Sequence, residues 1–131
     1  MSYGAFMNVT NRRSSDVRTF VIDVSCVYEH GGEGSHLEDF DDRLIRAGST
    51  YPGGGGQYIY TKNSGSCFFL ASSFRLKVTD DANGAIIGTV SFVDRGNEEW
   101  SVCSNTNTDL LNVNIDNLGS QGVITVTIAA S

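Results

Sequence analysis

Apolar and polar residues alternate with a period of two along most of this chain, and this pattern restricts it to β-structure. The clearest segment is residues 17–28, where one side carries Phe20, Ile22, Val24, Cys26 and Tyr28 and the other carries Thr19, Asp23 and Ser25. Successive side chains of a strand point to opposite faces, so this segment predicts a strand whose Phe20 side faces the core. No long window keeps the 3.6-residue period of a helix.

Four later segments repeat this alternation. Their apolar members are Phe74, Leu76 and Val78; Val90 and Phe92; Leu111, Val113 and Ile115; and Ile124, Val126 and Ile128. Turn-forming residues occupy positions 83–84, 95–97 and 118–120, and we expect the proline and glycine stretch at 52–56 to be a mobile loop between strands. Half-buried strands at this spacing predict an all-β fold, namely one antiparallel two-sheet β-sandwich domain spanning residues 1–131.

Composition and charge narrow the choice of partner. The chain has 131 residues, of which 40% are hydrophobic and 18% charged, as is typical of a globular protein with one core. Its formal net charge of −6 offers no electrostatic footprint for nucleic acid and disfavours strongly anionic lipid. A neutral lipid, a glycan or a protein surface remains open as the partner.

The cysteines and the N-terminal segment bear on the cellular compartment. Cys26, Cys67 and Cys103 are an odd number in a domain large enough to fold without cross-links, so we expect no disulfide framework and a reducing compartment. No basic segment followed by an apolar stretch begins the chain, and no apolar run approaches the ~20 residues of a membrane helix. We therefore expect a soluble protein, synthesised in the cytoplasm without a signal peptide and released, if at all, by a non-classical route.

Both histidines and several acids lie in one glycine-rich segment, residues 29–42. His30, Glu33 and His36 are the candidate ligands for a transition metal, and nearby aspartates are candidates for calcium. The segment matches no EF-hand loop or zincin helix, so a solvated acidic loop is the favoured interpretation. No nucleophile with a base and an orienting group is recognisable either. We expect no cofactor and a binding protein, not an enzyme.

Aromatic residues gather where strands are expected to begin or end. Tyr51, Tyr58 and Tyr60 flank the polyglycine stretch, and Phe6 and Trp100 mark strand ends. A ring with an apolar face and a polar edge suits stacking on a sugar or insertion at a membrane interface. The same residues also suit an ordinary core, and both interpretations stay open.

Short motifs in this chain resemble those of the aegerolysins in order and spacing. In the second half they are VTDDANG at 78–84, VSFVD at 90–94, NEEWSV at 97–102, SNT at 104–106 and NLGSQGVITV at 117–126. In the first half they are SYGAF at 2–6, VTN at 9–11, SDV at 15–17 and LIRAG at 44–48. The resemblance implies a two-sheet sandwich similar to the actinoporins, and recognition of membrane lipids, often sphingolipids with or without sterol. It also implies the role of small component in a two-part pore-forming or insecticidal toxin.

The chain departs from that family in its tryptophans. Phe6 and Cys26 stand where typical lipid-binding members carry tryptophan, and Trp100 alone is retained. Phe68, Phe69, Tyr51 and Tyr58 are candidates to replace the missing rings at the interface. The leading hypothesis is therefore an aegerolysin-like membrane-lipid-binding protein whose binding residues are Phe6, Tyr51, Tyr58, Phe68, Phe69 and Trp100, with a larger pore-forming protein as a candidate partner. A lectin-like carbohydrate-binding module is the alternative, and a metal-dependent activity in the histidine-containing segment comes third.

Overall fold

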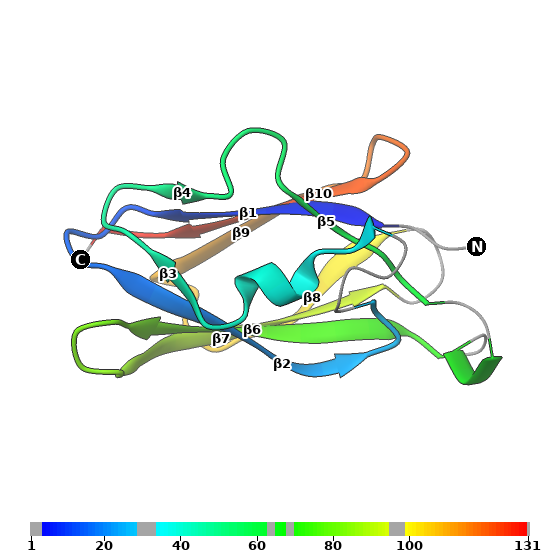
Figure 1. Ribbon diagram of the computed structural model, residues 1–131, viewed down its shortest axis with the longest axis horizontal. Coiled ribbons are helices and arrows are strands. Elements are labelled where there is room, and N and C mark those ends of the chain that lie inside the picture. Colours follow the sequence, from blue (N-terminus) through cyan, green and yellow to red (C-terminus); the bar gives the residue numbers. More distant parts are fainter. Residues whose placement is uncertain (1–3, 29–33, 63–64, 68–69, 95–98, 131) are drawn as a thin grey trace.

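Two β-sheets stacked face to face form the protein (Figure 1). The computed structural model describes residues 4–28, 34–62, 65–67, 70–94 and 99–130. The first sheet contains β4 (Thr50–Tyr51), β1 (Ala5–Asn11), β10 (Gly122–Ile128) and β9 (Leu111–Asp116) in that order, and β5 (Gln57–Ile59) also pairs with β1. The second contains β3 (Arg43–Ile45), β2 (Val17–Ser25), β6 (Ser72–Asp80), β7 (Ile86–Asp94) and β8 (Trp100–Asn105). Two short 3₁₀ helices, η2 (Leu37–Phe40) and η3 (Gly65–Cys67), lie between strands.

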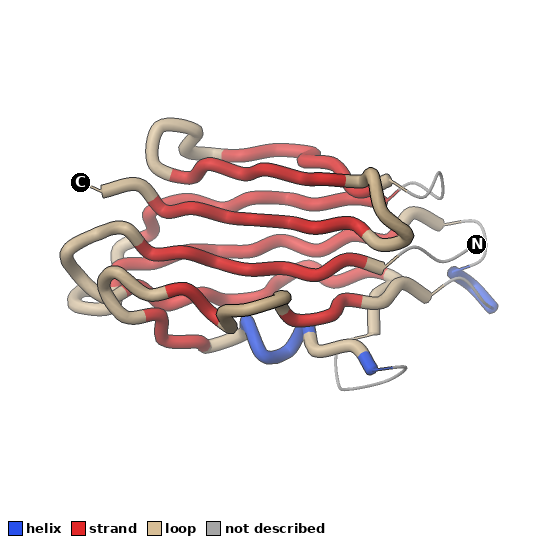
Figure 2. Tube along the Cα trace, turned by 90° about the horizontal axis from the view of Figure 1, so that it is seen from above, coloured by secondary structure: helices blue, strands red, loops and turns tan. Residues whose placement is uncertain are grey.

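The pairing confirms the expected β-sandwich. Strands pair antiparallel throughout both sheets except for β1 and β10, which run parallel over seven residue pairs from Ala5–Gly122 to Asn11–Ile128. The strands lie side by side along the long axis of the sandwich (Figure 2). The polyglycine stretch lies between β4 and β5, as the sequence predicts.

The core lies between the sheets and follows the predicted alternation in the later strands. Phe74, Leu76 and Val78 of β6 are buried, as are Val90 and Phe92 of β7, while Leu111 of β9 and Ile124, Val126 and Ile128 of β10 face them from the first sheet. The rings of Phe74 and Phe92 stack with centroids 5.0 Å apart. Neighbouring polar residues point outward, so each of these strands has one buried and one wet face.

Strand β2 corrects the prediction of which side faces the core. Val17 and Thr19 are fully buried, whereas Phe20 is only half-buried and lies beneath the Lys77 ammonium, 4.9 Å from the ring centroid. The Thr19 hydroxyl donates to the Phe40 carbonyl over 2.7 Å, which satisfies its polar group inside the protein. A register shift between Ile22 and Ser25 then interrupts the alternation, so a uniform period of two misassigned this strand.

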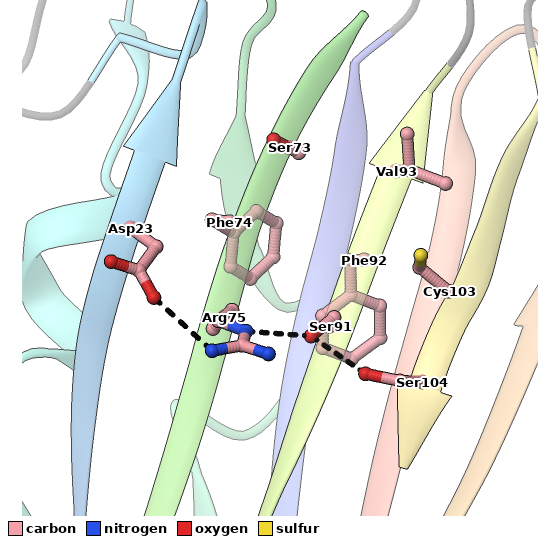
Figure 3. A pocket seen from close by; sticks show the side chains of 9 residues that line it. All are labelled: Asp23, Ser73, Phe74, Arg75, Ser91, Phe92, Val93, Cys103 and Ser104. Carbon is pink, nitrogen blue, oxygen red and sulfur yellow. Dashed lines mark hydrogen bonds and ion pairs between the residues drawn. The ribbon is translucent and has the colours of Figure 1, made fainter.

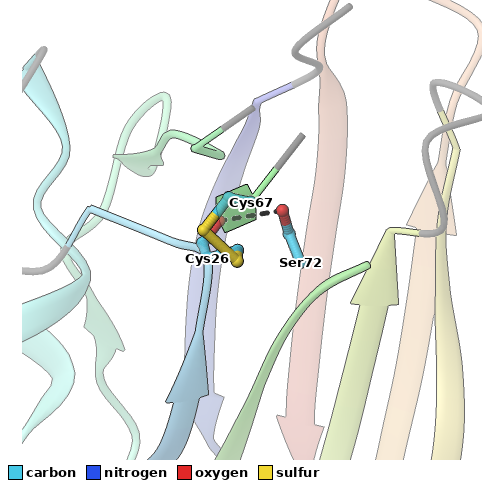
Figure 4. The surroundings of a disulfide bond; sticks show 3 residues. All are labelled: Cys26, Cys67 and Ser72. Atoms are coloured by element: carbon cyan, nitrogen blue, oxygen red, sulfur yellow. Dashed lines mark hydrogen bonds between the residues drawn. A yellow bond between two sulfur atoms is a disulfide. The ribbon is translucent and has the colours of Figure 1, made fainter. Parts of the chain in front are cut away.

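The cysteines correct a second expectation. Cys26 and Cys67 form a disulfide, with their Cα atoms 5.6 Å apart and a sequence separation of 41 (Figure 4). Cys103 is free and exposed on β8, as expected. The odd number of cysteines argued against a disulfide framework but did not decide this pair, because spatial proximity over that separation depends on the pairing of the sheets and not on the number of cysteines.

One end of the sandwich carries the features that matter below. Here β1, β10, β6 and β8 begin, and β5, β9, β2 and β7 end, on the right in Figure 1. The two sheets meet there through Asn117, whose amide accepts a hydrogen bond from the Trp100 nitrogen over 3.1 Å and donates to the Trp100 carbonyl over 3.0 Å. We call this end the loop end. Among the described residues, no helix is long and apolar enough to cross a membrane.

Candidate functional site

Four aromatic rings form a continuous row at the loop end. Phe6 contacts Tyr58 with ring centroids 5.1 Å apart, Tyr58 stacks on Tyr60 at 5.7 Å, and Tyr60 stacks on Tyr28 at 5.8 Å. All four side chains are half-buried, so each offers part of its ring to the surroundings. We call Phe6, Tyr58, Tyr60 and Tyr28 the aromatic row.

Sheet pairing and one buried hydroxyl hold the row together. Phe6 of β1 pairs with Tyr58 of β5, and the Tyr28 nitrogen, just beyond β2, donates to the Tyr60 carbonyl over 2.9 Å. The Ser35 hydroxyl donates to the Tyr28 carbonyl over 2.6 Å and accepts from the Tyr60 nitrogen over 3.0 Å. Ser35 is fully buried, so this link is shielded from water. The row therefore joins an extension of the second sheet to the edge of the first.

Gly4 makes room for the central ring of the row. A Cβ atom at Gly4 would lie 2.5 Å from the Tyr58 hydroxyl and 2.7 Å from the Gln121 side-chain oxygen. Only a residue without a side chain lets Tyr58 cover the backbone this closely. Glycine at this position therefore allows Tyr58 to take its place in the row.

Two features set the electrostatics of the row: the raised pKa of one phenol and the position of one ammonium group. Burial raises the pKa of the Tyr58 phenol above its ordinary value, and the neighbouring Tyr60 adds to the effect. The Lys62 ammonium lies 5.2 Å from the Tyr28 ring centroid. The row therefore combines a Tyr58 phenol whose neutral form is favoured with one cation held against an aromatic face.

Exposed apolar side chains lie at the same end of the sandwich as the row. Leu118, in the turn between β9 and β10, is 96% exposed, and Leu70, beyond η3, is 57% exposed. Val123 is 39% exposed and pairs with Phe6 across β1 and β10. The loop end thus combines half-buried rings with aliphatic groups in water, an arrangement that favours contact with an apolar or amphipathic surface.

The structure places the other predicted aromatic residues elsewhere. Trp100 is 1% exposed and meets Phe74 edge-on at 5.7 Å, so it belongs to the core and cannot stack on a ligand. Tyr51 pairs with Val9 in β4, beneath the Arg43 guanidinium at 4.3 Å and edge-on to Phe40, and takes no part in the row. Phe68 and Phe69 lie outside the described residues.

Sequence reasoning named Phe6 and Tyr58 but missed how the row is completed. Tyr60 appeared only as a flank of the polyglycine stretch, and Tyr28 was expected in the core. The sequence marks Leu118 only as part of a turn, and no local pattern singles out Lys62 or Leu70. The alternation of Tyr58 and Tyr60 around the buried Ile59 was the one local signal that both rings share a face.

The metal candidates are only partly described. His30 and Glu33 lie outside the described residues, so their grouping with His36 stays a prediction. His36 lies with Glu38 and Asp39, with one potential ligand atom of each within 4.8 Å of the others. Asp39 already faces the His36 ring nitrogen at 3.5 Å and accepts a hydrogen bond from Gln57 over 3.0 Å. These contacts account for His36 and Asp39, whereas the buried Oε2 atom of Glu38 has no hydrogen-bond partner among the described residues.

A hollow of about 330 Å³ lies on the outer face of the second sheet (Figure 3). Arg75 lies at its centre, donating to the Ser91 hydroxyl over 2.9 Å and pairing with the Asp23 carboxylate at 3.3 Å. Ser91 and Ser104 hydrogen-bond over 2.9 Å, and the free Cys103 lines the same hollow. The charges on Arg75 and Asp23 neutralise each other, so this network is a cross-strand contact of a sheet surface.

The described residues form a two-sheet β-sandwich. One solved structure with a similar fold is described as "Crystal structure of RahU protein in complex with TRIS molecule", and RahU is an aegerolysin-family protein. The two share 14% sequence identity, with 97% of this chain and 94% of that chain covered and a TM-score of 0.56. At this identity the likeness concerns the fold. Neither a protein-family model nor a curated protein sequence matches this chain.

Proposed function

We propose that this protein binds the surface of lipid membranes through its loop end and acts by binding, not by catalysis. The observation that carries the proposal is the aromatic row, which lies at the same end as the exposed Leu70 and Leu118. Tyrosine rings prefer the region between lipid headgroups and acyl chains, because the ring is apolar and its hydroxyl can hydrogen-bond. Aliphatic side chains beside them add hydrophobic burial.

Charge selects the class of lipid in this proposal. The chain carries a net charge of −6, which repels strongly anionic membranes. Neutral and zwitterionic lipids, including sphingolipids with or without sterol, are therefore the proposed targets. The resemblance of this chain's short motifs to those of the aegerolysins implies the same target class.

The proposal extends to a partner. An aromatic row can hold a protein at the membrane–water interface, but it does not span the bilayer. We therefore propose that a larger pore-forming protein performs any insertion, with this chain as the membrane-targeting component of a two-part toxin. Vesicle leakage that requires both proteins would support this role, and leakage that is independent of this chain would contradict it.

Liposome sedimentation tests membrane binding directly. Vesicles of phosphatidylcholine alone, with sphingomyelin, and with sphingomyelin and sterol are mixed with the wild type, Leu118→Ser and Tyr58→Ala. Each variant should weaken binding by about fivefold to tenfold, as expected for losing one side chain from the interface. Ile86→Ser is the matched control, because Ile86 is 64% exposed but lies at the opposite end of the sandwich. Binding to no vesicle, or equal loss in the control, would contradict the proposal.

Glycan binding is the second candidate, and the stacked tyrosines favour it. Tyr28 and Tyr60 lie within 13° of parallel, and Tyr58 and Tyr60 within 25°, so the row offers ring faces on which a pyranose could stack. Trp100 cannot serve this purpose because it is buried. A glycan array with the wild type and Tyr58→Ala distinguishes the two candidates, since a specific glycan signal lost in the variant would favour the lectin.

A further inference from the structure

The Cys26–Cys67 disulfide lies directly beside the aromatic row. Cys26 follows β2 and comes two residues before Tyr28, while Cys67 closes η3 and accepts a hydrogen bond at its carbonyl from the Leu70 nitrogen over 3.2 Å. The bond therefore ties the strand that leads to the row to the turn that presents Leu70. Both cysteines are half-buried, so neither residue is fully enclosed by the protein.

The backbone at this corner is held in an unusual conformation. Cys26 has a φ of +55°, in the left-handed region that residues with a side chain seldom occupy. Such a conformation persists where surrounding contacts hold it. The Cys26 carbonyl accepts two hydrogen bonds of 2.8 Å, one from the Lys62 nitrogen and one from the Ser72 hydroxyl (Figure 4). The disulfide and these bonds are the contacts that hold it.

The same contacts support the row. Lys62, whose nitrogen donates to Cys26, places its ammonium over Tyr28. The Tyr28 nitrogen in turn donates to Tyr60. Release of Cys26 would thus loosen, one after another, the segments that carry Lys62, Tyr28 and Tyr60.

We infer that the Cys26–Cys67 disulfide is a redox latch on the loop end, closed for membrane binding when oxidised and open when reduced. This inference rests on the proposed function. In the opening reaction a dithiol donates two electrons and two protons, the S–S bond breaks to give two cysteine thiols, and the dithiol closes to a cyclic disulfide. Closing reverses these steps with a small-molecule disulfide, such as oxidised glutathione, as the electron acceptor.

The test uses the full chain in a Cys103→Ser background, so that the exposed thiol cannot exchange. Binding to sphingomyelin vesicles is measured for the oxidised protein, the dithiothreitol-reduced protein and the protein reoxidised with oxidised glutathione. Reduction should weaken binding by about fivefold, the effect of releasing one partly inserted aliphatic side chain, and reoxidation should restore it. Cys67→Ser should behave like the reduced protein, and Leu118→Ser should weaken binding in both redox states.

Amide hydrogen exchange provides a readout that does not depend on lipid. The amides of Tyr28 and Lys62 should exchange faster after reduction, while that of Trp100, hydrogen-bonded to Asn117, should not change. If the oxidised protein binds no vesicle, the proposed function fails, and the exchange experiment still tests the latch. Unchanged exchange at Tyr28 and Lys62 would overturn the inference. If the oxidised protein does bind vesicles, equal binding by the reduced protein would overturn it as well.

Discussion

Tyr58 is the residue on which the aromatic row depends, because it contacts Phe6 on one side and Tyr60 on the other. Its phenol lies over Gly4, where no side chain would fit. Burial, with a contribution from Tyr60, raises the pKa of the phenol. The hydroxyl therefore stays protonated over a wider pH range than that of an exposed tyrosine.

This shift predicts how stability changes in alkali. A tyrosine with a raised pKa in the folded state stabilises the fold fully below the unfolded pKa of about 10, and loses that contribution as pH rises toward the folded value. The free energy of unfolding of the wild type should therefore fall more steeply above pH 10 than that of Tyr58→Phe, which cannot ionise. Urea unfolding at a series of pH values measures the difference. Parallel curves for the two proteins would show that Tyr58 does not couple to folding.

Trp100 provides a second prediction at the residue scale. It is the one tryptophan of the chain and is 1% exposed. Its fluorescence should have the short emission wavelength of a buried indole, resist quenching by acrylamide, and stay unchanged when vesicles are added. An emission shift on vesicle binding would mean that Trp100 meets the membrane, contrary to its position in the core.

At the scale of elements, side chains rather than sheet hydrogen bonds join several segments. Ser35 links Tyr28, three residues past β2, to Tyr60, directly after β5. Asn117 links the end of β9 to the start of β8. Each of these side chains pairs backbone groups that would otherwise have to find another partner. Their removal leaves polar groups without partners inside the protein.

Ser35→Ala should lower the free energy of unfolding by about 1–3 kcal/mol, because the Tyr28 carbonyl and the Tyr60 nitrogen lose a buried partner. Chemical denaturation measures this change. Ser104→Ala is the matched control, since Ser104 is exposed and its loss should change stability by no more than about 0.5 kcal/mol. Equal effects of the two substitutions would argue against the buried link.

Asn117→Ala should open the loop end between the two sheets. The substitution removes both hydrogen bonds to the Trp100 backbone, and the expected loss in unfolding free energy is again about 1–3 kcal/mol. Hydrogen exchange should quicken at the Trp100 amide, while the amides of the parallel pair β1–β10 keep their protection. Faster exchange throughout the first sheet would indicate global destabilisation instead of local opening.

At the scale of the whole molecule, net charge competes with hydrophobic contact. The chain carries −6 overall, while Lys62 is the cation described at the aromatic row. Vesicles that contain an anionic lipid should bind the protein more weakly than phosphatidylcholine vesicles at low ionic strength. The difference should shrink as salt shortens the screening length to about 10 Å at 0.1 M. Stronger binding to anionic vesicles would indicate a basic binding surface.

The alternation of apolar and polar residues was sufficient to predict most of the architecture. The alternation in β6, β7, β9 and β10 identified the residues that face the core, because neighbours in a regular strand point to opposite sides. The same rule failed in β2. There Thr19 is buried, with its hydroxyl hydrogen-bonded, and Phe20 is half-buried. A register shift later in the strand also interrupts the alternation. A bulge changes the period without a clear sign in the sequence.

The sequence by itself determined that this chain is an all-β sandwich, and it named Phe6 and Tyr58 as binding candidates. Only the tertiary structure decided that Trp100 belongs to the core, that Cys26 bonds to Cys67, and that Tyr28 and Tyr60 complete the aromatic row. The physical reason is how far apart in the sequence the residues that form each feature lie. Alternation acts between adjacent residues, whereas the disulfide and the row join segments that meet only after both sheets have formed.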